Sequence, residues 1–196
     1  MPEIQLNGKT IATQTGTNEP VLKNNVVMES GFSIPSGVTF PAGHVINIGQ
    51  QITTATNLYN TGQSSTAYEK IDDMDFTYNP IASNSKILIM WNLHLGLATN
   101  QSINIRLNVN NTTPLLGAGG SNSLSTGPSR YINNSGADIN LFEGKYLYQN
   151  TVQNAVVLQL WGTAQNGAFY INRGYSYDDS WRHRTPSYWT IFEIAG

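Results

Sequence analysis

Apolar and polar residues alternate along much of the chain after His44, which is the pattern of half-buried β-strands. Between residues 86 and 97 every second residue is a large apolar one, from Ile87 to Leu97. The positions between them are themselves partly apolar, so this strand is expected to lie in the middle of a sheet. Between residues 102 and 109 the second face is polar, which predicts a strand with one solvated side.

Seven further segments have similar alternation or a short apolar run bounded by turn residues. They are His44–Thr53, Ile71–Tyr78, Ile139–Leu141, Lys145–Tyr148, Ala155–Gly162, Ala168–Asn172 and Ser187–Ile194. Connectors rich in Asn, Gly and Ser separate them, and no helix of ten residues is predicted. About nine antiparallel strands at this spacing favour an all-β fold, an antiparallel jelly-roll β-sandwich, with a closed barrel as the alternative.

Residues 1–43 differ from residues 44–196, the predicted jelly-roll β-sandwich domain. Their apolar positions are scattered, and prolines and glycines interrupt any long element. We therefore predict an extended N-terminal arm that becomes ordered on another molecule, although it could also supply a peripheral strand to its own domain. Short apolar pairs could each add a strand to another sheet, and these candidate contacts are Ile4, Leu6, Val26 and Met28.

Composition narrows the class of protein further. Ten basic and twelve acidic residues give a net charge of −2, too little positive charge for nucleic-acid binding as the main role. Cysteine is absent, so neither disulfides nor thiolate metal sites are expected. The first seven residues do not read as a signal peptide, and the longest wholly apolar run, Ile87–Trp91, is too short to cross a bilayer. We expect no membrane partner and synthesis in a cytoplasm.

Three acidic residues, Asp72, Asp73 and Asp75, form a cluster that could offer oxygen ligands to Ca²⁺. The glycine and glutamate of a helical calcium loop do not follow them, so the favoured interpretation is a strand with Asp73 and Asp75 on its solvated face. The three histidines are widely separated and have no second ligand at zinc spacing; they are His44, His94 and His183. No metal and no cofactor is therefore expected.

Catalytic motifs are also missing from the sequence. The chain has no Gly-x-Ser-x-Gly elbow, phosphate loop or dinucleotide fingerprint. A carboxylate pair of the glycosidase type would have to come from residues far apart in the sequence, such as Glu69, Glu143 and Glu193. We assign no catalytic residues.

The densest mixture of charged and aromatic residues lies between residues 177 and 184. Tyr, Trp and Arg are enriched at binding hot spots, so this segment could contact a sister subunit, a neighbouring protein or a sugar. A surface loop with local ion pairs is the alternative. The candidate contact residues are Tyr177, Trp181, Arg182 and Arg184.

The segment 32–46, which contains Pro35-Ser36-Gly37 and Pro41-Ala42-Gly43-His44-Val45-Ile46, resembles the lead-in of virion proteins of tailed phages. Segments 68–71 and 80–89 are similar to their next two strands, and segments 171–173 and 190–196 to their closing strand. The resemblance implies a homotrimeric jelly roll like that of the complement and tumour-necrosis-factor proteins. It also implies a place on the virion surface or in a fibre.

The resulting hypothesis is a non-enzymatic capsid cement or decoration trimer, located in the virion, whose arms hold the major capsid protein or another virion protein. Extended segments would pair with neighbouring backbone, and symmetry would multiply weak contacts. Two alternatives remain, a tail-fibre or receptor-binding tip that contacts host surface glycan, and a glycan hydrolase.

Overall fold

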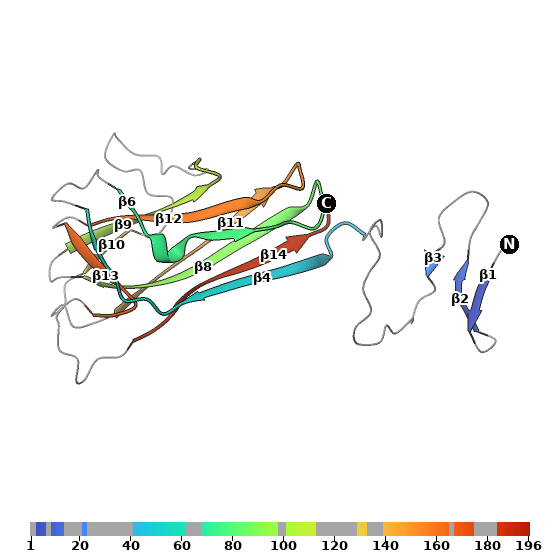
Figure 1. Ribbon diagram of the computed structural model, residues 1–196, viewed down its shortest axis with the longest axis horizontal. Coiled ribbons are helices and arrows are strands. Elements are labelled where there is room, and N and C mark those ends of the chain that lie inside the picture. The colour runs from blue at the N-terminus through green and yellow to red at the C-terminus, as the bar shows by residue number, and fades with distance from the viewer. Residues whose placement is uncertain are drawn as a thin grey trace. The chain divides into compact units, whose positions relative to one another are not determined.

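The computed structural model describes residues 3–6, 9–13, 21–22, 41–61, 68–97, 101–112, 129–132, 139–164, 167–174 and 184–196 (Figure 1). These residues contain β-strands and one short 3-10 helix, so the prediction of an all-β fold is confirmed. That helix, η1, spans Asp72–Met74, and no helix among the described residues is long and apolar enough to cross a membrane. The chain divides into two compact units, Met1–Thr39 and Phe40–Gly196.

The sequence predicts an extended arm for this part of the chain. The first unit instead contains a small antiparallel sheet. Its strands, in the order β1-β2-β3, are β1 (Glu3–Leu6), β2 (Lys9–Thr13) and β3 (Val21–Leu22). Leu6 is the register partner of Lys9, and the dipeptide between them, Asn7-Gly8, is the one most typical of a two-residue hairpin. Within the described residues β1 is an edge strand, paired on one side only.

The second unit, which we call the body, contains two antiparallel sheets. The six-stranded sheet consists of β4 (Val45–Thr53), β5 (Leu58–Asn60), β8 (Lys86–Leu97), β11 (Ile139–Gln149), β13 (Ala168–Ile171) and β14 (Ser187–Ile194). The five-stranded sheet consists of β6 (Glu69–Lys70), β7 (Phe76–Tyr78), β9 (Gln101–Val109), β10 (Ser129–Ile132) and β12 (Val156–Ala164).

Strand β8 is the centre of the six-stranded sheet, as its two-sided apolar pattern predicted. One edge pairs with β11 along Lys86–Gly96, and the other pairs first with β14 and then, from Leu95, with β13. Strand β4 continues the sheet beyond β14, and β5 continues it beyond β13. Figure 1 shows β4, β14, β8 and β11 running side by side.

Strand β12 has the corresponding place in the five-stranded sheet. It pairs with β9 along one edge and with β7 and then β6 along the other, while β10 extends the sheet beyond β9. The inward side chains of both sheets form one hydrophobic cluster, to which β8, β9 and β12 contribute most. The body is therefore a sandwich of two sheets over a shared core.

Two tryptophans occupy the centre of this core. Trp91 and Trp189 are register partners on β8 and β14, and their ring centroids lie 6.0 Å apart. The Trp91 ring covers Gly144 on β11, where a Cβ atom would overlap the ring. This explains a difference from prediction, because Gly144 was expected to separate two strands, whereas β11 continues through it. Because glycine has no side chain, it leaves room for the indole ring at this position.

The predicted strand over Ile71–Tyr78 is wrong in its first half, which forms η1. The Met74 amide donates to the Ile71 carbonyl at 2.8 Å and the Asp75 amide donates to the Asp72 carbonyl at 3.1 Å, so the chain turns before β7 begins at Phe76. In addition, β5 and β10 were not predicted, because segments of three or four residues carry too little periodicity to be recognised. Strand β6 lies within segment 68–71, for which the resemblance implied a strand.

Candidate interaction surface

The outward side chains of the six-stranded sheet form the most distinctive surface among the described residues. Strand alternation places Ile89, Trp91 and their equivalents inward and sends Leu88 and Met90 outward. The pairing registers then align the outward residues across four strands. Ile48 of β4 faces Phe192 of β14, Phe192 faces Leu88 of β8, and Leu88 faces Leu147 of β11.

This row is apolar across its whole width and open to solvent. Ile48 is 61% exposed and Leu147 is 53% exposed, while Phe192 and Leu88 between them are half-buried by their neighbours. Further apolar side chains on the same side extend the row in both directions. We call the resulting surface the outer apolar face; its members are Val45, Ile48, Ile52, Leu88, Met90, Leu141, Leu147, Tyr188, Phe192 and Ile194.

Three charged side chains lie on this face. Lys86 points outward at the start of β8, and Glu143 and Lys145 point outward from β11, between Leu141 and Leu147. Other outward positions hold uncharged groups such as Gln50 and Thr190. Exposure of an apolar surface that spans four strands to water costs free energy. Large patches of this kind on soluble proteins mark interaction sites. The chemistry that this face supports is the burial of apolar area against another surface.

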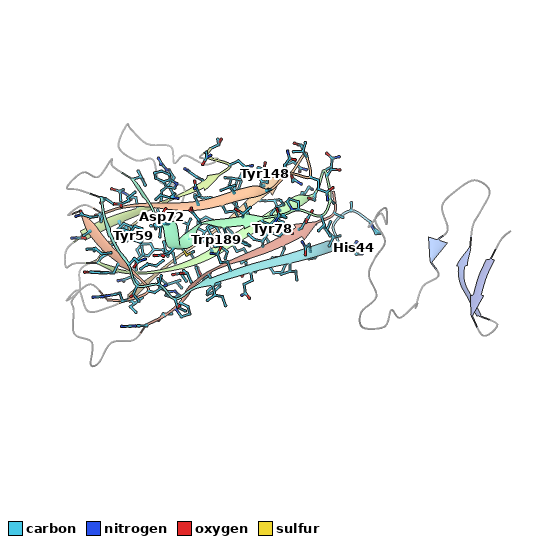
Figure 2. The ribbon with its side chains drawn as sticks, viewed as in Figure 1. His44, Tyr59, Asp72, Tyr78, Tyr148 and Trp189 are labelled. Atoms are coloured by element: carbon cyan, nitrogen blue, oxygen red, sulfur yellow. The ribbon has the colours of Figure 1, made fainter. Side chains whose placement is uncertain are left out.

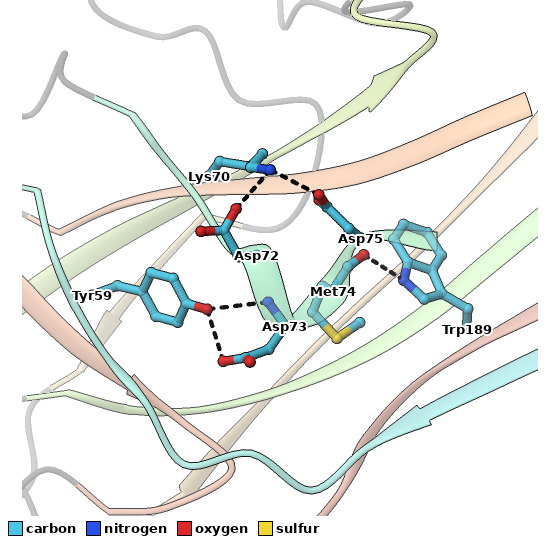
Figure 3. Close-up of polar contacts among 7 residues, drawn as sticks. All are labelled: Tyr59, Lys70, Asp72, Asp73, Met74, Asp75 and Trp189. Carbon is cyan, nitrogen blue, oxygen red and sulfur yellow. Dashed lines mark hydrogen bonds and ion pairs between the residues drawn. The ribbon is translucent and has the colours of Figure 1, made fainter. Parts of the chain in front are cut away.

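The acidic cluster between residues 72 and 75 is held by other side chains (Figure 3). Lys70 Nζ lies 2.6 Å from the Asp72 carboxylate and 2.7 Å from that of Asp75. Asp73 accepts hydrogen bonds from the Tyr59 hydroxyl at 2.8 Å and from the Asn57 side-chain amide. Because η1 replaces the expected strand, Asp73 and Asp75 do not share one solvated strand face. No group of three or more His, Asp or Glu among the described residues is arranged to hold a metal ion.

These contacts also shift the ionisation of their partners. Hydrogen bonds to Asp72 and Asp75 raise the pKa of Lys70. Burial, reinforced by the Asp73 carboxylate, raises the pKa of Tyr59, so its hydroxyl stays protonated and donates. On the core side of η1, the Trp189 Nε1–H group donates a hydrogen bond to the Met74 carbonyl at 2.8 Å (Figure 3). The cluster therefore fastens η1 to both sheets.

The three glutamates considered as a catalytic pair occupy different environments. Glu193 is buried on the inner side of β14 and accepts hydrogen bonds from the Tyr78 hydroxyl at 2.9 Å and from the amides of Ile81 and Ala82. Glu143 points outward from β11, on the opposite side of the same sheet, and Glu69 lies on β6 of the other sheet. Glu193 thus connects β14 to β7 and to the following turn.

Two of the three histidines are described. His44 directly precedes β4 (Figure 2) and follows Gly43, which has φ +90°; the His44 Nδ1 atom lies 3.0 Å from the Pro41 carbonyl oxygen. His94 is half-buried on the outward side of β8, opposite Leu141, and burial lowers its pKa. His183 lies outside the described residues.

The contact residues predicted from sequence are only partly described. Ile4 and Leu6 lie on β1, on either side of an irregularity in the β1–β2 register between Ile4 and Gln5. Arg184 is exposed shortly before β14 begins. The other five predicted contact residues lie outside the described residues, so their role in binding stays a prediction. They are Val26, Met28, Tyr177, Trp181 and Arg182.

Sequence reasoning did not identify the outer apolar face. The one available signal was the partly apolar second face of β8, which was interpreted as a sign of central position only. Comparisons with known proteins do not assign the chain to a family. No protein-family model matches the chain, and no curated protein is significantly similar to it.

Proposed function

We propose that this protein is a non-enzymatic structural protein of a tailed-phage virion, a capsid cement or decoration protein. In this proposal the body forms a homotrimer through the outer apolar face, and the N-terminal arm contacts the major capsid protein. The observation that carries the self-association is the apolar row of Ile48, Phe192, Leu88 and Leu147. The virion location and the number of three subunits follow from the sequence resemblance over residues 32–196.

A jelly-roll assignment for the body is supported by the nesting of its strand pairs. If the eight main strands are taken in chain order, the first pairs with the last, the second with the seventh, the third with the sixth and the fourth with the fifth. These pairs are β4 with β14, β7 with β12, β8 with β11 and β9 with β10. A long hairpin rolled into two sheets has this pairing.

The arm would attach by strand addition. Strand β1 is an edge strand of its small sheet within the described residues, so its second edge can pair with backbone of a neighbouring protein. Ile4 and Leu6 are the apolar residues of this strand that we assign to the contact. Three arms on one trimer would increase the avidity of a contact that is weak singly.

The self-association is tested with the double variant Ile48→Lys/Leu147→Lys. Both side chains are more than half exposed, so the substitutions leave the fold of the single chain intact within about 0.5 kcal/mol. We expect the variant to sediment as a monomer at concentrations where the unchanged protein is a trimer. The matched control is Val157→Lys on the outward side of β12, which should remain a trimer. A variant that remains trimeric would refute the assigned interface.

The attachment is tested by deletion of residues 1–30. The truncated protein should sediment as a trimer but no longer bind capsids that lack the protein. If it still decorates the capsids as fully as the complete chain, the arm is not the attachment device, whereas the self-association experiment would be unaffected.

A further inference from the structure

The outward side of the five-stranded sheet carries an arginine held against two aromatic rings. Arg106 of β9 is the register partner of Trp161 on β12, and its guanidinium carbon lies 5.3 Å from the centroid of that ring. The same carbon lies 4.5 Å from the centroid of Tyr68, just before β6. All three side chains are partly exposed. Stacking on aromatic rings holds a guanidinium in one orientation and leaves the N–H groups at its edge able to donate hydrogen bonds.

The charge of Arg106 has no carboxylate partner among the described residues. The neighbouring cation on the same row, Lys70, forms ion pairs with both Asp72 and Asp75. The Nε atom of Arg106 is buried and makes no hydrogen bond to a described group. The Arg106 guanidinium is therefore held in place without a carboxylate partner. Guanidinium groups bind carboxylates through two parallel hydrogen bonds, so a ligand carboxylate could pair with it.

One hydrogen-bonding side chain, Asn104, is partly exposed beside this group on the same side of the sheet. Its register partner Thr163 and the pair on the other side of Arg106, Asn108 and Gln159, are buried. A ligand on this surface would meet a guanidinium, aromatic rings and the Asn104 amide. An acidic saccharide presents the complementary groups, namely a carboxylate, an apolar C–H face and ring hydroxyls.

We propose that Tyr68, Arg106 and Trp161 form a binding site for carboxylated saccharide. Arg106 pairs with the sugar carboxylate, and the two rings hold the guanidinium while Trp161 packs against the sugar. This site goes beyond the proposed assembly function and does not depend on it, because it lies on the sheet that does not carry the outer apolar face.

The test is calorimetric titration of the full-length protein with a galacturonate oligomer and, separately, with its methyl ester. The ester keeps the rings and hydroxyls but removes the charge, so we expect it to bind about 10- to 100-fold more weakly. Equal binding of both ligands, or no binding of the acid, would overturn the proposal. A polyglutamate peptide of similar length should bind at least about tenfold more weakly than the galacturonate, because it lacks sugar rings. Equal binding of the peptide would show an unselective anion site and would also overturn the saccharide assignment.

Two arginine variants provide a matched comparison. Arg106→Gln should weaken binding of the galacturonate by about 10- to 100-fold. Arg173→Gln removes the same charge from another arginine stacked on a tyrosine, with its guanidinium carbon 4.1 Å from the Tyr170 ring centroid, and should change binding less than about twofold. Equal losses in both variants would indicate a general charge effect and refute the site. If Arg106→Gln fails to fold, the comparison of acid with ester on the unchanged protein still decides.

Discussion

The two sheets of the body share one core, yet their outward sides have opposite chemistry. The six-stranded sheet presents an apolar row over four strands, whereas the five-stranded sheet presents Arg106 stacked on Tyr68 and Trp161. Inward side chains of both sheets belong to one core, so the difference lies in the outward residues. It supports the two proposed roles, in which one side associates with another apolar surface and the other meets polar ligands.

The largest effect is expected from a substitution that removes hydrogen bonds between the two sheets. Glu193→Ala removes the acceptor of the Tyr78 hydroxyl and of the Ile81 and Ala82 amides, at the connection between the two sheets. Unpaired buried donors are costly, so the free energy of unfolding should fall by about 3 kcal/mol. Chemical denaturation at fixed protein concentration measures this. Glu143→Ala, an exposed glutamate on the same sheet, should change stability by less than about 0.5 kcal/mol. Equal effects of the two variants would contradict the structural role of Glu193.

A somewhat smaller loss is expected at the glycine beneath the Trp91 ring. Gly144→Ala places a Cβ atom inside the volume of that ring, so Trp91 must shift against Trp189. Overpacking of this kind costs about 1–3 kcal/mol. The change in tryptophan environment can be followed by near-ultraviolet circular dichroism and the stability by thermal unfolding. The neighbouring outward variant Lys145→Ala serves as control, and a Gly144 variant that matches it would show that the ring has other space available.

Salt should separate the two outward sides without any substitution. At about 1 M salt the screening length falls to about 3 Å, so binding of a galacturonate oligomer to Arg106 should weaken several-fold relative to 0.1 M salt. Association through the outer apolar face should be unchanged or stronger, because salt does not screen apolar contacts. Sedimentation and calorimetry at the two salt concentrations measure both quantities. Parallel weakening of the two interactions would mean that the apolar row is not the basis of association.

The smallest effect is expected from acidification. Burial lowers the pKa of His94 below the usual 6.5, so the unfolded chain takes up a proton first as the pH falls. The stability that depends on neutral His94 is therefore complete above pH 6.5 and is lost below it, by no more than about 1.4 kcal/mol per pH unit. The variant His94→Gln should flatten this part of the stability profile. Identical profiles for His94→Gln and the unchanged protein would remove His94 as the cause.

The long strands were predictable and the surfaces were not. The bounds predicted for β8 and β14 agree with the structure, because each has enough residues for alternation to be unambiguous. By contrast, η1 depends on which carbonyl accepts the Asp75 amide, and the continuity of β11 depends on a ring that lies over Gly144. Both are tertiary contacts that an alternation pattern does not contain.

The same limit applies to the interaction surfaces. The apolar row joins residues 48, 88, 147 and 192, and only the pairing registers bring them together. Alternation placed Arg106 on the polar side of its strand but did not predict that Tyr68 and Trp161 would lie against it. The Asn7-Gly8 dipeptide was the available local signal for the β1–β2 hairpin, and the proline and glycine content of the arm obscured it.

The central position of β8 has a consequence for the order in which the chain can acquire its structure. The strand is synthesised as residues 86–97, but its two edges are completed by β11, about fifty residues later, and by β14, about one hundred residues later. A nascent chain would therefore emerge from the ribosome with its most apolar strand unpaired until β11 is made, and with the second edge of that strand incomplete until the last strand arrives. Such non-local pairing makes collapse to the final topology slow, on the order of milliseconds to seconds, and exposes the partly made chain to capture by chaperones.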